Sequence, residues 1–408
     1  MPGTVITTGN FSYVDEASQS VVQSTVHKYY DRKLLENAKT QFVFQKYGQM
    51  RPIPARNGKR VEFRKWDLFD PNLAIKGLTE GVTPDSQDMS QTQIEAGVRQ
   101  YGAYVEVSDL LDLTNFDDNI SDSVELLGEQ LGTVLEWVTR DELSAGTNVQ
   151  YAGGSASRLL LTPASVLTLA EVKKAVRTLK KMKARKFGNG RRPHFICICG
   201  PDATYDLWND DLWEAVAQYQ NAEAIYDGEI GRMFGVVFVE STETKIFSPS
   251  VDNKVNAAVT AQTEFVLANE PTEAEVAYLS KGGNKIYVAG VEATLDATAP
   301  YTAATKTVKV TEAANFAKDA VVQSQDAGAC DATSKLCAPI HASLIFGRDA
   351  YGIVDIAGSK AMKTIIHPHG HGDDALEQRA TVGAKVMAFG VKRLNEEWIV
   401  RIEHGASA

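Results

Sequence analysis

The side chains best suited to metal chemistry lie near the C-terminus, where His367, His369 and His371 occupy every second position. Three imidazoles at this spacing in an extended segment can bind zinc or nickel, and Asp373 and Asp374 follow as further ligands. A metal site normally has partners that orient its ligands, and the sequence identifies none from elsewhere in the chain. We therefore interpret the cluster as a polar Gly/Pro turn, with a metal site as the alternative, and we predict no cofactor.

The four cysteines form two pairs of different kinds. Cys197 and Cys199 lie in an apolar run, and their two-residue spacing does not match the Cys-x-x-Cys of zinc sites. A free cysteine packs as a small apolar residue, so we expect both in the core of a strand. Cys330 and Cys337 flank a polar loop, where two free thiols are the expectation in a reducing cytosol and a disulfide is the alternative after release.

A basic run extends from Lys173 to Arg192 and contains ten Lys and Arg residues. Such a run can bind phosphate groups. It also follows the polar face of an amphipathic helix, which charged residues normally occupy. We therefore interpret it as a solvated face, with contact to an acidic partner as the alternative.

Composition and missing motifs exclude several classes of protein. The 408 residues include 42 Lys and Arg and 52 Asp and Glu, a net charge of −10, whereas a protein that coats DNA would be basic. Apolar runs fall well short of the roughly 18 residues of a membrane helix, and the N-terminus lacks the features of a signal peptide. The nucleophile elbow, the phosphate-binding loop, the His-Glu-x-x-His pair and the dinucleotide-binding glycine motif are all absent. We predict a soluble protein that is not an enzyme.

Periodicity predicts the helices and strands that position these residues, in the fold class α+β (mixed α/β). Apolar residues at three-and-four spacing predict helices over 18–47, 119–144, 167–184 and 205–219. Apolar or alternating runs predict strands over 60–64, 101–107, 195–200, 232–239, 340–346, 381–394 and 398–403. We interpret 60–64 and 101–107 as a hairpin with a long tip, and the last two strands as neighbours across a short turn. No arginine occurs between Arg232 and Arg348, which marks about 245–338 as an inserted, mostly β lobe.

The order of these elements is informative together with several short strings. The strings lie at 34–44, 52–64, 78–84, 100–104, 346–352 and 377–385. In order and content the chain resembles the Hong Kong ninety-seven-type coat proteins of tailed bacteriophages, in the branch typified by N4-like phages. The resemblance covers most of the chain except about 245–338.

The resemblance implies five segments. In this family the hairpin is an extended loop that lies across a neighbouring subunit, and the long helix is the spine of a peripheral domain. The tip of the hairpin, about 68–95, is longer than structureless loops inside compact domains usually are, which agrees with contacts to another molecule. The segments are an N-terminal arm and helix (1–50), the extended loop (51–109), the peripheral domain with the spine helix (110–147), the axial domain (148–360) with its insertion (about 245–338), and a return to peripheral strands (361–408).

The resemblance also implies a function. It is that of a major capsid protein whose hexamers and pentamers form an icosahedral shell around double-stranded DNA, without sequence-specific DNA binding and without contact to a membrane. The implied partners are further copies of the chain, a portal protein, a separate scaffolding protein and a decoration protein, and the implied location is the virion after assembly in the host cytoplasm. The scaffold is expected to be separate because some twenty residues precede the first helix. The expected assembly contacts are Arg64, Trp66, Lys76, Glu80, Glu129, Glu136 and Arg379.

Two other classes of protein stay open from the sequence. One is the shell protein of a cellular nanocompartment with the same fold, which shells purified without DNA would indicate. The other is a metal-dependent enzyme that uses His367, His369 and His371, which a stoichiometric bound metal would indicate.

Overall fold

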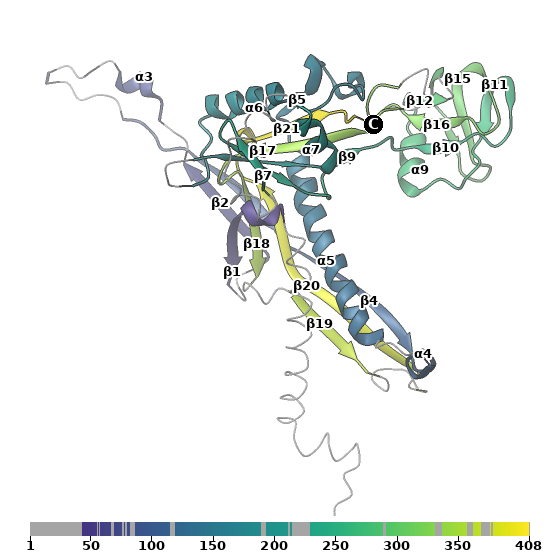
Figure 1. Ribbon diagram of the computed structural model, residues 1–408, viewed down its shortest axis with the longest axis horizontal. Helices are drawn as coiled ribbons and strands as arrows, with labels where there is room; N and C mark the ends of the chain where they lie inside the picture. Colours follow the sequence, from purple (N-terminus) through teal and green to yellow (C-terminus); the bar gives the residue numbers. More distant parts are fainter. Residues whose placement is uncertain are drawn as a thin grey trace, which may run out of the picture. The chain divides into compact units, whose positions relative to one another are not determined.

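A computed structural model gives the arrangement of the helices and strands (Figure 1). The chain divides into two compact units: residues 1–142 with 349–394, and residues 143–348 with 395–408. The helix expected over 18–47 lies outside the described residues except for its last turn, which is a 3-10 helix, η1 (Gln45–Tyr47). The structure describes residues 43–54, 56, 58–66, 69–75, 77, 80–81, 86–114, 119–188, 193–210, 213, 229–288, 291–330, 337–356, 362–368, 376 and 378–407.

The first unit is built around β20 (Arg379–Arg393), a strand of 15 residues. It forms a five-stranded sheet of order β1-β18-β20-β19, and β4 also pairs with β20. Every second residue at the start of β20 is buried, from Ala380 to Val386, as a sheet with one covered face requires. β20 pairs with β4 (Arg99–Ser108), β18 (Tyr351–Ile356) and β19 (Met362–His367), and β1 (Gln49–Ile53) pairs with β18.

The hairpin expected between 60–64 and 101–107 is wrong in its second strand. β2 (Arg60–Trp66) pairs instead with β3 (Gln91–Gly97), in the register Trp66 to Gln91. Residues 101–107 lie in β4 and pair with β20. The pattern failed because 91–97 is mostly exposed, and such a strand needs no apolar alternation. The loop between the strands therefore covers 67–90 and includes a short helix, α3 (Pro71–Ala74).

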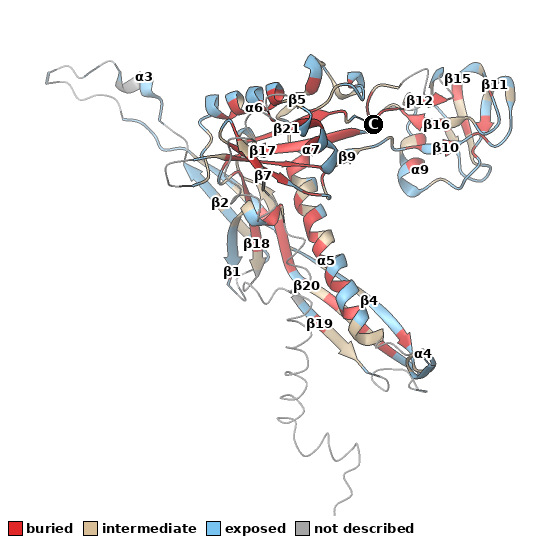
Figure 2. Cartoon of the chain, in the orientation of Figure 1, coloured by how far each residue is buried: buried red, intermediate tan, exposed pale blue. Residues whose placement is uncertain are grey.

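The expected spine helix is confirmed as α5 (Asn119–Ser144), which follows the short helix α4 (Asp109–Thr114). At 1.5 Å per residue its 26 residues span about 40 Å. Buried residues recur along it (Figure 2), because leucines four residues apart share one face. These leucines are Leu127, Leu131 and Leu135, each at most 3% exposed, whereas Leu126 on the other side is 65% exposed.

The second unit contains a seven-stranded sheet of order β5-β21-β17-β6-β8-β7, with β9 also paired to β17. All seven residues of β17 are buried, so both faces of the sheet are covered at its centre. Two amphipathic helices, α6 and α7, pack their apolar residues against Phe195, Cys197 and Cys199 of β6. The strands are β5 (Val149–Tyr151), β6 (Phe195–Cys199), β7 (Glu229–Met233), β8 (Val236–Glu240), β9 (Ile246–Phe247), β17 (Ile340–Phe346) and β21 (Ile399–His404), and the helices are α6 (Leu169–Lys181) and α7 (Pro201–Trp208).

Two expectations for this unit are wrong. The strand expected over 232–239 is a hairpin of β7 and β8, turned at Phe234 and Gly235, which both have positive φ angles as such tight turns require. The strand expected over 398–403 does not pair with 381–394. It is β21, which lies between β5 and β17. A turn at Asn395 thus joins strands of different sheets, although a short connection made them look like neighbours.

The insertion is confirmed as mostly β. It forms one sheet of order β10-β16-β12-β13 and another of order β11-β15-β14, around a core of its own. Its helix α9 (Glu273–Leu279) begins with a capping box between Thr272 and Glu275. The strands are β10 (Asp252–Lys254), β11 (Val259–Val266), β12 (Lys285–Val288), β13 (Val291–Thr294), β14 (Tyr301–Thr302), β15 (Thr307–Phe316) and β16 (Val321–Ser324). In the described part of the chain, no helix is long and apolar enough to cross a membrane.

The burial of α5 predicts a difference between two leucines of that helix. Leu131→Ala removes a side chain that is 2% exposed and should lower the free energy of unfolding of the free subunit by about 2–5 kcal/mol. Leu126→Ala, on the exposed side, should change it by about 0.5 kcal/mol or less. Urea denaturation of both variants, followed by circular dichroism, measures this. Equal losses would contradict the buried face of α5.

Candidate functional site

The contact residues expected on the extended arm lie at the surface where they are described. Arg64 is an exposed residue of β2, with Glu62 3.2 Å away as its ion-pair partner. Trp66, the last residue of β2, is 57% exposed, which is unusual for so large an apolar side chain. Glu80 is exposed in the loop, and Lys76 lies outside the described residues. The extended loop therefore has both charged and apolar side chains exposed at its surface.

Two further expected contacts, Glu129 and Arg379, are also exposed. Glu129 lies on the outer side of α5. Arg379 begins β20, and its guanidinium is 3.9 Å from the carboxylate of Glu106 on β4. Exposed ion pairs of this kind contribute about 0–1 kcal/mol, so Arg379 can exchange its partner at little cost.

Glu136 was expected to be an exposed contact, and this is wrong. It is 0% exposed, and its carboxylate accepts hydrogen bonds from the backbone N–H of Phe44 at 2.8 Å and of Gln45 at 3.4 Å. The hydroxyl of Tyr351 donates to the carbonyl of Phe44 from the other side. Burial, with Glu136 nearby, raises the pKa of Tyr351 far above its usual value, so this hydroxyl keeps its proton. These hydrogen bonds hold the backbone at Phe44 and Gln45 against α5 and β18.

A signal for this burial is present in the sequence but is not an apolar one. Gly128 and Gly132 precede Glu136 at intervals of four residues, and both are buried. Residues four apart lie on one line of a helix, and glycine there lets another backbone come close. A search for leucines alone therefore finds the row of buried leucines on α5 and misses the adjacent row, which consists of Gly128, Gly132 and Glu136.

A second buried carboxylate, Glu403, holds the end of α5. Arg158 donates to its two oxygens at 2.7 and 2.6 Å, and Arg401 donates to one of them at 2.8 Å. Arg401 also donates to the carbonyl of Gly146, at 3.0 Å, and to that of Ser144, the last residue of α5. A cation suits this end of a helix, where carbonyl groups lack partners in the helix and carry negative partial charge.

A buried Ser–His pair occupies the C-terminal strands. The Nε2 of His404 lies 2.9 Å from Ser343 Oγ, and its Nδ1 lies 2.6 Å from the carbonyl of Gly405. Such a pair can activate a serine in an enzyme, but both side chains are 0% exposed, so no substrate reaches them. Burial is the main cause that lowers the pKa of His404 to about 4, and the ring of His341, stacked 6.0 Å away, lowers it further. The pair is structural.

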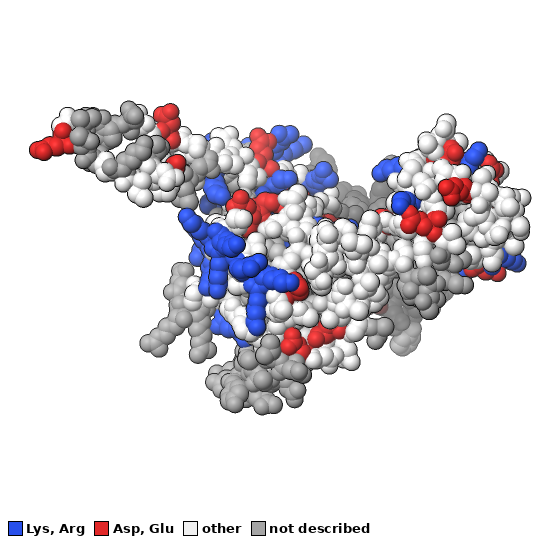
Figure 3. Space-filling view, turned by 90° about the horizontal axis from the view of Figure 1, so that it is seen from above, with Lys and Arg blue, Asp and Glu red and all other residues white. Residues whose placement is uncertain are grey.

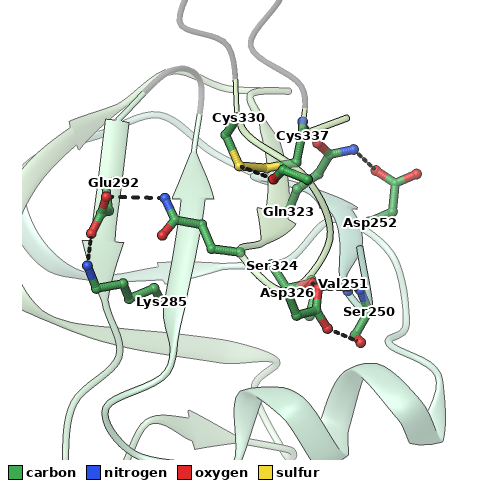
Figure 4. The surroundings of a disulfide bond; sticks show 12 residues. Ser250, Val251, Asp252, Lys285, Glu292, Gln323, Ser324, Asp326, Cys330 and Cys337 are labelled. Carbon is green, nitrogen blue, oxygen red and sulfur yellow. Dashed lines mark hydrogen bonds and ion pairs between the residues drawn. A yellow bond between two sulfur atoms is a disulfide. The ribbon is translucent and has the colours of Figure 1, made fainter. Parts of the chain in front are cut away.

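The expectation of two free thiols at 330 and 337 is wrong, because Cys330 and Cys337 form a disulfide (Figure 4). The backbone N–H of Cys337 donates to the side chain of Gln323 at 2.6 Å, and that side chain donates to Asp252 at 3.2 Å. The bond therefore closes a short loop next to β16 and β10 of the insertion. By loop-closure entropy, a loop of this size contributes about 2–3 kcal/mol. The other two cysteines, Cys197 and Cys199, are free and buried, as expected.

The histidine cluster is only partly described. His367 ends β19 opposite Thr381 and is half-buried. His369 and His371 lie outside the described residues. Among the residues that the structure does describe, no group of three His, Cys, Asp or Glu side chains could hold a metal ion.

Comparison with solved structures identifies the fold. The capsid of Ralstonia phage GP4 matches with a TM-score of 0.56 and 12% identity, over 90% of this chain and 91% of that chain. The capsid of cyanophage Pam1 matches with a TM-score of 0.54 and 14% identity, over 90% and 93%. The head of Helicobacter pylori bacteriophage KHP40 matches with a TM-score of 0.51 and 10% identity, over 87% and 88%. No protein-family profile and no curated protein sequence matches.

The chain therefore has the fold of phage capsid proteins. The fold class expected from the sequence, mixed α and β in the Hong Kong ninety-seven-type arrangement, is confirmed.

Two glutamates of α5, the buried Glu136 and the exposed Glu129, give a matched test of the buried face of this helix. Glu136→Ala leaves two buried backbone N–H groups without their acceptor and should destabilise the free subunit by about 1–3 kcal/mol for each. Glu129→Ala changes an exposed side chain and should cost about 0.5 kcal/mol or less. Denaturation of both variants measures the difference, and Glu136→Gln should fall between them because it keeps one acceptor. A neutral effect of Glu136→Ala would contradict the buried position.

The lowered pKa of His404 predicts acid sensitivity. Unfolded histidine takes up a proton near pH 6.5, whereas folded His404 resists it until about pH 4, so the unfolded state binds more protons between these values. Stability from this group is fully present above pH 6.5 and should fall by about 3 kcal/mol as the pH drops to about 4. Denaturation of the free subunit at a series of pH values measures this slope.

The control is His404→Asn, whose amide N–H can replace Nδ1–H and does not titrate. It should be less stable at pH 7 but should lose less stability on acidification, and the remaining slope includes His341, whose pKa is also lowered by burial. An unchanged acid slope in the variant would rule out His404 as its source.

Proposed function

We propose that this chain is the major capsid protein of a tailed bacteriophage, and that its copies assemble into an icosahedral shell around double-stranded DNA. The observation that carries the proposal is the likeness to the GP4 capsid, which spans about nine tenths of both chains. The role is structural, without catalysis, and the location is the virion.

The surface of the first unit supports self-assembly. Leu110 and Leu113 on α4 are 68% and 84% exposed, and Ile75 in the loop is 80% exposed. Exposed apolar side chains are unfavourable in water, by about 25 cal/mol for each Å² that a contact would bury. Contact with a neighbouring copy removes this cost.

The finer assignments belong to the same proposal. The first unit corresponds to the peripheral domain with its arm, and the second to the axial domain with the insertion. Arg64, Trp66, Lys76, Glu80, Glu129 and Arg379 remain the proposed contact residues, and Glu136 is withdrawn from them. The proposed partners are further copies in hexamers and pentamers, with portal, scaffolding and decoration proteins. The net charge of −10 supports enclosure of DNA without tight binding to it.

Assembly of the purified chain tests the proposal. The chain, expressed in bacteria, should form closed shells or ring-shaped hexamers and pentamers, visible by negative-stain electron microscopy and by sedimentation. Leu113→Asp should leave the secondary structure of the subunit unchanged and reduce assembly, because it places a charge in an apolar contact. A wild-type chain that remains a monomer or a small dimer at high protein concentration would contradict the function.

A further inference from the structure

The polar side of α6 forms a basic groove, defined here by Lys173, Val176, Arg177, Lys180, Lys181 and Phe234. These residues line a hollow of 540 Å³. Phe234 lies in the turn between β7 and β8, where it is 44% exposed, and the ammonium group of Lys173 is 4.2 Å from its ring. Figure 3 shows Lys and Arg side chains gathered on the face that carries α6. The groove therefore combines one aromatic ring with four cationic side chains.

The cations of the basic groove are not neutralised by the described residues around them. The one acidic residue of α6, Glu171, is buried and bonded to Lys174 and Gln150. Among the described residues, none lies in an ion pair with Lys173, Arg177, Lys180 or Lys181. Like charges four residues apart on a helix repel each other by about 0.2–0.5 kcal/mol per pair. An anionic partner would remove this repulsion, so the groove favours one.

Charge arithmetic indicates which partner fits. The run from Lys173 to Arg192 has ten basic and no acidic residues, so the rest of the chain has a net charge of −10 − 10 = −20. Every further copy of the chain therefore offers a strongly acidic surface. The segment 67–90, named here the acidic loop, has five acidic residues and one lysine.

The acidic loop also has the exposure and the apolar groups that the groove requires. Its described carboxylates, Asp70, Glu80 and Asp88, are all exposed, and none of them lies in an ion pair with another described residue. Phe69 and Met89 beside them are 55% and 64% exposed. They can contact Phe234 and Val176 while the carboxylates meet the lysines and the arginine.

We propose that the basic groove of α6 binds the acidic loop of a second copy of this chain. The inference rests on the proposed function, because it needs copies to meet during assembly. Opposite charges accelerate the encounter and fix the orientation of the loop, and the contact weakens as salt increases. The phosphate groups of DNA are the other anions that the groove could bind, and the test distinguishes them from the acidic loop.

Charge reversal in the full chain tests the contact. Lys173→Glu with Arg177→Glu should reduce the yield of shells about tenfold, which corresponds to about 1.4 kcal/mol. Glu80→Lys with Asp88→Lys should do the same from the other side, and all four changes together should restore the yield. Glu312→Lys combined with the groove variant is the control, because Glu312 is an exposed residue of β15 outside the proposed contacts, and it should restore nothing. Thermal melts check that each free subunit stays folded.

A second measurement does not depend on shells. A Glu80→Cys chain mixed with a Lys180→Cys chain under mild oxidation should give cross-linked heterodimers. The pair Glu312→Cys with Lys180→Cys should give at most a tenth as many, because Glu312 is exposed but lies outside the proposed contacts. Specific cross-links in a chain that forms no shells would support the contact and contradict the proposed function. Shells that form without specific cross-links would support the proposed function and contradict the contact.

Two results from the charge variants overturn the inference. The first is a shell yield that stays at the wild-type level in both twofold charge-reversal variants, or a fourfold variant whose shell yield is no higher than that of either twofold variant. The other is a groove variant whose shells form normally but hold less DNA, which would assign the groove to phosphate.

Discussion

The carboxylate of Glu403 has no surface in contact with water, so its counter-charges must come from fixed positions in the fold. Arg158 comes from the 3-10 turn η3 (Arg158–Leu160), and Arg401 comes from β21, two residues before Glu403 on the same strand. Arg401 also binds the last carbonyls of α5. Removing one partner from such a group costs about 3–5 kcal/mol, because the remaining charge stays buried. The end of the long helix, the loop beyond it and the C-terminal strand are thus specified together.

Local pattern was enough to predict the elements that bury one regular face. The leucines of α5 and the continuous apolar runs of β6 and β17 are examples, and the absence of arginine between Arg232 and Arg348 indicated the β-rich lobe that has a core of its own. Strand partners could not be predicted in the same way. Alternation shows which residues share a face, but not which strand lies alongside, so β3 was missed and β21 was placed beside the wrong neighbour.

For the candidate site, the exposure of residues was also easier to predict from the sequence than their bonding partners. Exposure of Arg64, Glu129 and Arg379 follows from charge on a polar face, and sequence alone could anticipate it. The hydrogen-bond partners of Glu136 could not be anticipated, because they are backbone amides 91 and 92 positions away in sequence. The bond between Cys330 and Cys337 depends on an isolated β-bridge between these two residues, which brings the thiols together across a loop. A single sequence is therefore least able to predict which distant groups a buried polar side chain will bond to.

The length of β20 affects how the first unit can deform. Along its 15 residues this strand is hydrogen-bonded to β4, β19 and β18. A shift by one residue would turn its buried alanines and valines outward and break three ladders at once. Sliding between strands is therefore costly, whereas a sheet can change its twist with every hydrogen bond kept. Under mechanical load this unit should behave as an elastic plate that flexes and recovers, and its strands should not creep past one another.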